Sequence, residues 1–109
     1  KVSTKILARW LASFNTDDPA GMMLLASLAT PGTGTLKNRF KNTTIEGSKV
    51  HGKSGYLLGV SSLSGYITFD IRPPLAFSII VNNVKGTIKG AKTMQERIVF
   101  AALKNIMQN

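Results

Sequence analysis

Apolar residues at helical spacing mark the first element of the chain. A helix is predicted from Ser3 or Thr4 to about Phe14, with one apolar face made of Ile6, Leu7, Trp10, Leu11 and Phe14. We interpret Trp10 as a core residue rather than a partner anchor, because it shares that face. Asp17 or Asp18, followed by Pro19, predicts the start of a second helix. Its apolar run from Met22 to Leu28 suggests burial on several sides, although methionines also suit a partner surface.

Between positions 49 and 81 the pattern changes to that of strands. The stretch from Lys49 to Phe69 predicts strand, turn and strand, with β-prone apolar residues punctuated by glycines. Asp70–Pro74 is a turn, because two prolines end any strand. Leu75–Val81 is almost continuously apolar, which is typical of an interior strand covered on both faces.

The rest of the chain is a loop region and a final helix. Ala29–Lys49 has little regular pattern beyond a helical turn at Leu36–Phe40, and Asn82–Gly90 is a glycine-containing basic loop. The last helix is predicted from Lys92 or Thr93 to Met107, with a Thr93-x-x-Glu96 capping box. Its expected buried stripe is Ile98, Val99, Ala102, Leu103 and Ile106. Helices, then three antiparallel strands, then a helix predict an α+β fold with helices packed on a sheet, without internal repeat or domain boundary.

Composition narrows the class of protein. The 109 residues are 43% hydrophobic and 17% charged, as in a globular domain, and the net charge is +9. Cysteine is absent and His51 is the only histidine, so we expect no disulfide framework and no thiolate or multi-histidine metal site. We expect no cofactor and no bound metal. No run reaches the roughly 18 apolar residues of a membrane span.

A phosphate-loop pattern, G-x-x-x-x-G-K-[ST], is present from Gly47 to Ser54. That motif requires a buried strand before it and a helix N-terminus after it. The preceding residues are polar here, and the following ones alternate like a strand. We therefore interpret the match as accidental.

The tripeptide Lys53-Ser54-Gly55 places a cation, a hydroxyl and a glycine in succession on a strand. Alternation puts Lys53 and Gly55 on one face and Ser54 on the other. At a sheet edge, a ligand carboxylate could meet both the ammonium and the hydroxyl, and the glycine would leave room for another backbone. Without flanking signals, a lysine on an exposed edge more simply protects against aggregation.

The flanking residues carry a resemblance. GKSGYLLGVSSLSGYITF resembles the Lys-Thr/Ser-Gly box and following strands of class C low-molecular-mass penicillin-binding proteins, the D-alanyl-D-alanine carboxypeptidase/endopeptidase family within the serine β-lactamase-like superfamily. Gly34–Phe40 (GTLKNRF) is similar to that family's D-G-T-L-x-x-R-F segment, and Leu75–Asn82 is similar to its next strand. The resemblance covers nearly the whole chain.

This resemblance implies the roles of the site residues. Lys53 would attract the substrate's terminal carboxylate and support proton movement, and Ser54 would donate a hydrogen bond to that carboxylate. Gly55 would let the substrate backbone lie alongside the strand, and the Tyr56 N–H would be one of two oxyanion donors. Substrates would be peptidoglycan stem peptides and β-lactams, in the periplasm or cell envelope of a bacterium.

Three departures from the family pattern matter. Tyr56 stands where Ser or Thr is usual, and Thr33-Gly34 stands where the family has Asp-Gly. No serine is followed by lysine three positions later, so the nucleophilic S-x-x-K motif is absent. We expect S-x-N to be missing as well, since both motifs precede the Lys-Thr/Ser-Gly box in the family's order. Residues 1–109 are thus predicted to be the C-terminal part of a transpeptidase-like domain, inactive alone, with a truncated sheet edge able to self-associate.

A second hypothesis is a non-catalytic basic module that binds nucleic acid or an acidic polymer. Five basic residues fall within seventeen positions: Lys37, Arg39, Lys41, Lys49 and Lys53. Only Phe40 lies among them as an aromatic, so no stacking platform for bases is visible. Binding of that kind would weaken steeply with salt.

Overall fold

A computed structural model describes residues 3–41, 45–82 and 88–107. The elements are α1 (Thr4–Ala12), α2 (Pro19–Ser27), the short 3₁₀ helix η1 (Gly34–Leu36), β1 (Ser48–Leu57), β2 (Val60–Phe69), β3 (Leu75–Val81) and α3 (Ile88–Met107). The predicted α+β class and the three strands are confirmed. The helical turn expected at Leu36–Phe40 is displaced toward its N-terminal side, as η1.

The sheet is antiparallel, in the order β1-β2-β3. Leu58 and Gly59 alone join β1 to β2, and both have positive φ, 47° and 80°. A two-residue turn of this hand matches the twist of the two strands, and glycine is favoured in it. The hairpin therefore fixes the register that pairs Lys53 with Ser64 and Gly55 with Ser62.

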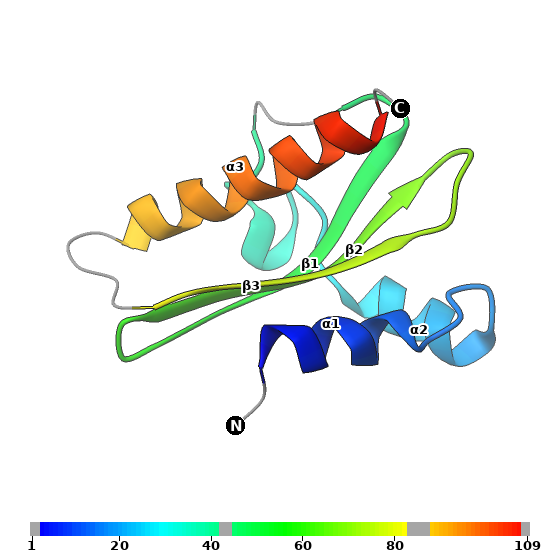
Figure 1. Ribbon diagram of the computed structural model, residues 1–109, viewed down its shortest axis with the longest axis horizontal. Helices are drawn as coiled ribbons and strands as arrows, with labels where there is room; N and C mark the ends of the chain where they lie inside the picture. Colours follow the sequence, from blue (N-terminus) through cyan, green and yellow to red (C-terminus); the bar gives the residue numbers. More distant parts are fainter. Residues whose placement is uncertain (1–2, 42–44, 83–87, 108–109) are drawn as a thin grey trace.

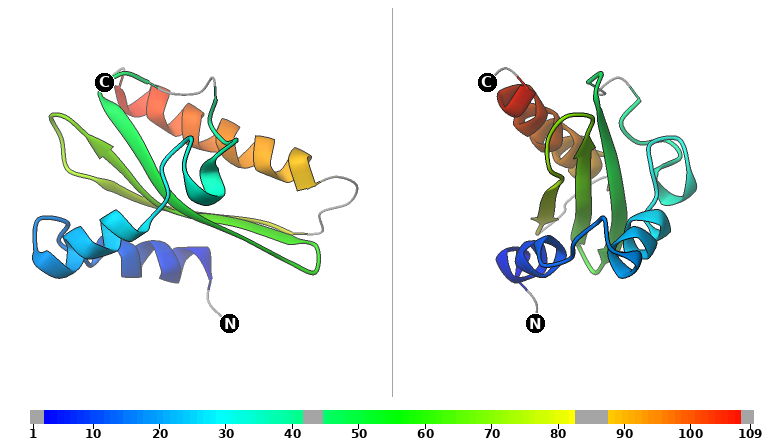
Figure 2. Two further views of the ribbon diagram at one scale, coloured as in Figure 1. Left: turned by 180° about the vertical axis from the view of Figure 1, so that it is seen from behind. Right: turned by 90° about the vertical axis from the view of Figure 1, so that its right-hand side faces the viewer.

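Helices cover both faces of this sheet. Figure 1 shows α3 across one face, and α1 and α2 against the other. The edge-on view in Figure 2 places α1 under β2 and β3, α2 under β1, and the segment with η1 beside the outer edge of β1. The tip of the β1–β2 hairpin extends beyond the N-terminal end of α1 (Figure 1).

The core lies between the sheet and α3. Seven apolar side chains are almost completely buried there: Leu36, Phe40, Val50, Leu63, Ile67, Val99 and Leu103. They come from η1 and its following loop, two strands and the final helix. The apolar side chains of these elements therefore pack together in one layer. Burial of this surface is the main stabilising contribution of the fold.

Helix α1 packs less completely than its apolar pattern predicts. Ser3 caps the helix through its Oγ, which accepts from the Ile6 N–H at 3.1 Å. Leu11 is buried, but Trp10 is 51% exposed and Ile6 57% exposed. The assignment of Trp10 to the core is therefore wrong. Its indole instead makes an edge-to-face contact with Phe14, with the two ring centroids 4.9 Å apart.

Helix α2 starts where the Asp-Pro signal places it, with Asp18 at the N-cap position and Pro19 in the first turn. Met22 and Met23 are exposed, at 57% and 73%, so the expected burial on several sides is wrong. The buried residue of α2 is Gly21, and the loop before the helix approaches it so closely that a Cβ there would lie 1.9 Å from the Asn15 carbonyl oxygen. A side chain at position 21 would therefore clash with that loop.

Strand β3 lies at the edge of the described sheet, not in its interior. Ala76 to Val81 are half-buried, and Leu75 is 38% exposed. The expected cover on both faces of β3 is present, because α1 packs on one face and the core on the other. The predicted interior position is wrong for the described part of the molecule, which supplies no strand on the outer side of β3. An apolar run indicates that both faces of a strand are covered, but it does not show that both edges of the strand are paired with other strands.

Helix α3 begins at Ile88, earlier than predicted, so the capping box at Thr93 does not form. Residues 88–90, expected in a basic loop, are helical; positions 83–87 lie outside the described residues. Glu96 turns instead to the segment after η1: it pairs with Arg39 at 2.6 Å and accepts the Phe40 N–H at 2.9 Å. The stripe is partly confirmed, with Val99 and Leu103 buried and Ile98 46% exposed.

In the part of the chain that the structure describes, no helix is long and apolar enough to cross a membrane.

Candidate functional site

The Lys53-Ser54-Gly55 tripeptide lies in the second half of β1, where the strand is exposed. The register confirms the predicted alternation: Lys53 and Gly55 share the face of α1 and α2, and Ser54 lies on the face of α3 with Leu63 opposite. Lys53 and Gly55 are exposed, and Ser54 is half-buried. Tyr56, next along the strand, is 52% exposed.

The outer edge of β1 is paired at one point and open beyond it. Gly52 donates its N–H to the Ala29 carbonyl at 2.8 Å and accepts the Ala29 N–H at 3.0 Å. In an antiparallel sheet the backbone groups of alternate residues face the same way. Ser54 and Tyr56 therefore also direct their N–H groups away from β2. In the described residues, neither N–H bonds to backbone outside the sheet.

The Lys53 side chain folds back along this edge. Its Nζ donates to the carbonyl of Ser54 at 2.9 Å, so the ammonium lies beside the outward-facing backbone. In the described residues no carboxylate pairs with it. The open edge thus combines an unpaired cation with two unused N–H donors, an arrangement suited to an anionic, extended ligand.

Gly55 keeps the adjoining face of the strand clear. A Cβ at this position would approach the Ser62 Oγ to 2.9 Å, and any longer side chain would stand between Lys53 and Leu57. Glycine therefore leaves room for a second backbone to approach the strand.

The phosphate-loop match has the wrong structure for that function. Gly47 precedes β1 and the rest of the motif runs along the strand to Ser54, with β2 following after a two-residue turn. A phosphate loop needs its backbone N–H groups gathered at a helix N-terminus. The interpretation of the match as accidental is confirmed.

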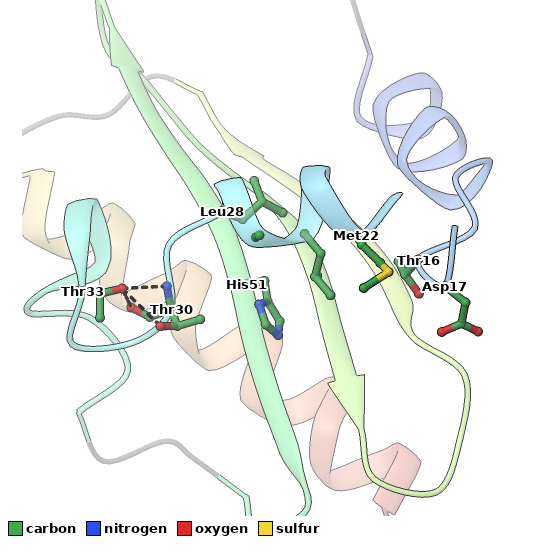
Figure 3. Close-up of a pocket in the computed structure, with 9 residues that line it drawn as sticks. Thr16, Asp17, Met22, Leu28, Thr30, Thr33 and His51 are labelled. Atoms are coloured by element: carbon green, nitrogen blue, oxygen red, sulfur yellow. Dashed lines mark hydrogen bonds between the residues drawn. The ribbon is translucent and has the colours of Figure 1, made fainter. Parts of the chain in front are cut away.

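A groove of about 580 Å³ lies between α2 and β1, on the Lys53 face of the sheet. Figure 3 shows His51 in its middle, with Thr30 and Thr33 on one side and Met22, Thr16 and Asp17 on the other. His51 hydrogen-bonds Thr68 Oγ1 through Nε2 at 3.0 Å. Burial, and secondarily the charge of Lys49, lower the pKa of His51 and so favour the neutral imidazole. No pattern in the sequence marks this groove, because only the convergence of α2 on β1 creates it.

Thr33 has a defined role in the loop beside this groove. Its Oγ1 accepts the Thr30 N–H at 3.0 Å and donates to the Thr30 carbonyl at 2.8 Å. The hydroxyl thus closes a turn before η1. A local cap occupies the position where the resemblance places an aspartate.

One sequence expectation needs correction. Ser13-Phe14-Asn15 does match S-x-N in letters, so this pattern is not absent from the chain. The Ser13 hydroxyl donates to the Trp10 carbonyl at 2.6 Å, and Asn15 Oδ1 accepts the Asp17 N–H at 2.9 Å. Phe14 and Asn15 line a cavity with Tyr66 and Pro73, and Lys53 is not part of that lining. The hydrogen bonds of Ser13 and Asn15 thus lie at the C-terminal end of α1, and Ser13-Phe14-Asn15 does not face the β1 edge.

The basic cluster is also altered by folding. Lys37, Lys41, Lys49 and Lys53 are exposed, but Arg39 is only 5% exposed. Its guanidinium pairs with Glu96 and donates to the Gln95 Oε1 at 3.0 Å and the Lys92 carbonyl at 3.2 Å. Arg39 therefore stabilises the fold and does not present its charge at the surface, so four of the five basic residues remain available to a ligand.

Comparison with protein families gives one match. The model of the D-Ala-D-Ala carboxypeptidase 3 (S13) family matches residues 1–104, nearly the whole chain. No curated protein and no solved structure gives a significant match.

Proposed function

The chain belongs to the D-Ala-D-Ala carboxypeptidase 3 (S13) family, whose members are serine carboxypeptidases, and we propose that its β1 edge forms one wall of such an active site. The observation that carries the proposal is the open half of that edge. There the Lys53 ammonium lies beside the outward-facing backbone of Ser54 and Tyr56.

The substrate would lie along this edge as an extra strand. Main-chain hydrogen bonds hold a peptide in that mode, and its charged end is held by specific groups. The terminal carboxylate would meet the Lys53 ammonium from one face and the Ser54 hydroxyl from the other. The carbonyl of the bond to be cleaved would lie at the Tyr56 N–H, which would stabilise the negative charge that develops on its oxygen.

Tyr56 would act through its backbone alone. A serine or threonine at this position could add a hydroxyl close to the strand, whereas the phenol oxygen of Tyr56 is carried far from Cβ. Carboxylate recognition would therefore rest on Lys53 and Ser54. This predicts weaker discrimination for a free terminal carboxylate than in members with the hydroxyl.

The nucleophile would come from outside these 109 residues. No S-x-x-K pattern occurs in the sequence, and the S-x-N match at Ser13 is occupied by local hydrogen bonds. We therefore treat the chain as the C-terminal part of a larger transpeptidase-like domain of the bacterial periplasm or cell envelope. Peptidoglycan stem peptides and β-lactams would be the ligands of the whole protein.

The test is covalent labelling by a fluorescent penicillin. We expect a protein encoded by the native reading frame, including any residues before Lys1, to be labelled at one serine, and the isolated 109 residues to remain unlabelled. Lys53→Ala should slow labelling of the longer protein about a hundredfold or more, as expected for loss of an electrostatic group at the reacting centre.

Lys49→Ala is the matched control, because Lys49 is exposed and lies on the same face of the same strand. It should be labelled at the wild-type rate. Specific labelling of the isolated chain would refute the external nucleophile. A longer protein that neither labels nor releases D-alanine would refute the proposed function itself.

A further inference from the structure

The proposed site has a closed end, which is formed by Ala29. This residue uses both of its backbone groups on Gly52, so a peptide lying along the open edge cannot continue past Ser54. In the proposed binding mode, the terminal carboxylate stops at that point. The C-terminal residue of the substrate, which is released by cleavage, therefore lies next to the bridge.

The groove between α2 and β1 lies on the face of β1 that carries Lys53, close to the place where that residue would lie. His51, in the middle of the groove, is two residues before Lys53 and on the same face of β1. Two residues along a strand span about 7 Å. A side chain of the released residue that points to the face of α1 and α2 can therefore enter the groove.

The lining indicates which side chain fits. Met22, Leu25 and Ala26 of α2, together with Leu28 directly after that helix, form an apolar wall, and His51 lies in the middle of the groove. The carboxylate of Asp17 lies at the far end, beside Thr16 (Figure 3). In the described residues no cation pairs with Asp17, in a protein of net charge +9. An aliphatic chain with a terminal cation complements this combination.

We infer that the groove is a subsite for the side chain of the residue that is released. Its ligand class is a D-amino acid with an unbranched aliphatic side chain, favoured further by a terminal ammonium group. This inference rests on the proposed function. In the acylation step the serine oxygen bonds to the carbonyl carbon, the bond from that carbon to the leaving nitrogen breaks, and the serine proton ends on the leaving amine. Water then hydrolyses the ester and restores the serine.

The experiment uses the longer protein with three acyl-peptides that differ only in the C-terminal residue: D-Ala-D-Ala, D-Ala-D-norleucine and D-Ala-D-lysine. The released residues have a methyl, a butyl and a butylammonium side chain. The D-alanine peptide measures catalysis without contact to the groove. The D-norleucine peptide tests contact with the apolar wall, and the D-lysine peptide also tests the attraction between its ammonium group and Asp17.

Ala26→Trp fills the groove from an exposed position of α2. It should lower kcat/KM about tenfold for the D-norleucine and D-lysine peptides, and less than twofold for the D-alanine peptide. Ala20→Trp is the matched control, because Ala20 is exposed on the same helix and outside the groove lining. Asp17→Asn should lower kcat/KM for the D-lysine peptide alone, about threefold.

Equal loss for all three peptides, or no loss in Ala26→Trp, would overturn the subsite. Loss of selectivity for D-lysine over D-norleucine in Ala20→Trp would also contradict it. Penicillin labelling of the wild type separates the two proposals. If the wild type is labelled but Ala26→Trp does not change the relative kcat/KM values of the three peptides, only the subsite is refuted. If the wild type is not labelled, the proposed function is refuted and the subsite with it.

Discussion

On the α3 side of the sheet, seven apolar side chains from five segments are buried almost completely. On the α1 and α2 side, by contrast, Ile6, Trp10, Met22 and Met23 are each more than half exposed. Both sides carry amphipathic or apolar helices, so apolar content does not explain the difference. The α3 side holds the molecule together, while the α1 and α2 side carries the groove and the Lys53 face of β1. Lys53 and the groove therefore lie on the side whose packing is less complete.

The polar contacts follow the same division. On the α3 side, Arg39, Gln95 and Ser61 form a buried network, which continues to Glu96 and to the N–H of Phe40. Phe40 has a positive φ of 59°, a conformation that costs free energy in a residue with a Cβ. The Glu96 carboxylate stabilises it. On the other side, the Tyr66 hydroxyl donates to the carbonyl of Leu11 and so links β2 to α1.

The largest effect is expected for Glu96→Gln. The change keeps the shape of the side chain but leaves the buried Arg39 guanidinium without its counter-charge. Breaking such a pair costs about 3–5 kcal/mol of unfolding free energy. Urea denaturation should show this loss, whereas Arg97→Gln, an exposed neighbour on α3, should change stability by less than about 0.5 kcal/mol. Equal effects of the two changes would mean that the network does not stabilise the α3 side.

The comparison of the two faces is tested directly by Leu103→Ala and Trp10→Ala. Leu103 is 1% exposed in the core, and its truncation should cost about 3 kcal/mol. Trp10 is half-exposed and retains mainly its contact with Phe14, so its loss should cost about 1 kcal/mol. A larger effect at Trp10, the bigger side chain, would show that the α1 side contributes as much stability as the core.

The smallest effect concerns pH and His51. Its pKa is lowered in the folded chain, so the unfolded chain binds more protons as the pH falls below about 6.5. The stability that neutral His51 contributes is present above that pH and is lost as the pH falls toward the folded pKa. The difference in unfolding free energy between wild type and His51→Gln should therefore shrink between pH 7.5 and pH 5.5. A constant difference would show that the environment of His51 does not disfavour its charge.

Much of the fold could be predicted because each signal was local. The β-prone residues around Leu58-Gly59 predict a hairpin, and Asp18-Pro19 predicts where α2 begins. The alternation that places Lys53 and Ser54 on opposite faces follows from strand geometry. The family resemblance of the Lys-Ser-Gly stretch depends only on residue order, and the family match over residues 1–104 agrees with it.

The errors arose where a residue had a choice of partners. Glu96 could cap its own helix at Thr93 or pair with Arg39 across the fold, and the long-range pair prevailed because α3 begins a turn earlier. Trp10 has the spacing of a core residue, but no described element covers it. Ser13-Phe14-Asn15 matches a catalytic pattern in letters, while its side chains close the end of α1.

The sequence by itself determined the family, the α+β order of elements and the tripeptide that carries the candidate chemistry, because these depend on neighbouring residues. Only the tertiary structure decided that the edge of β1 is closed by Ala29 at Gly52 and open at Ser54 and Tyr56. It also decided that α2 and His51 enclose a groove beside Lys53. Such features join segments far apart in the chain, so they depend on the burial of side chains from several elements at once, which no local pattern contains.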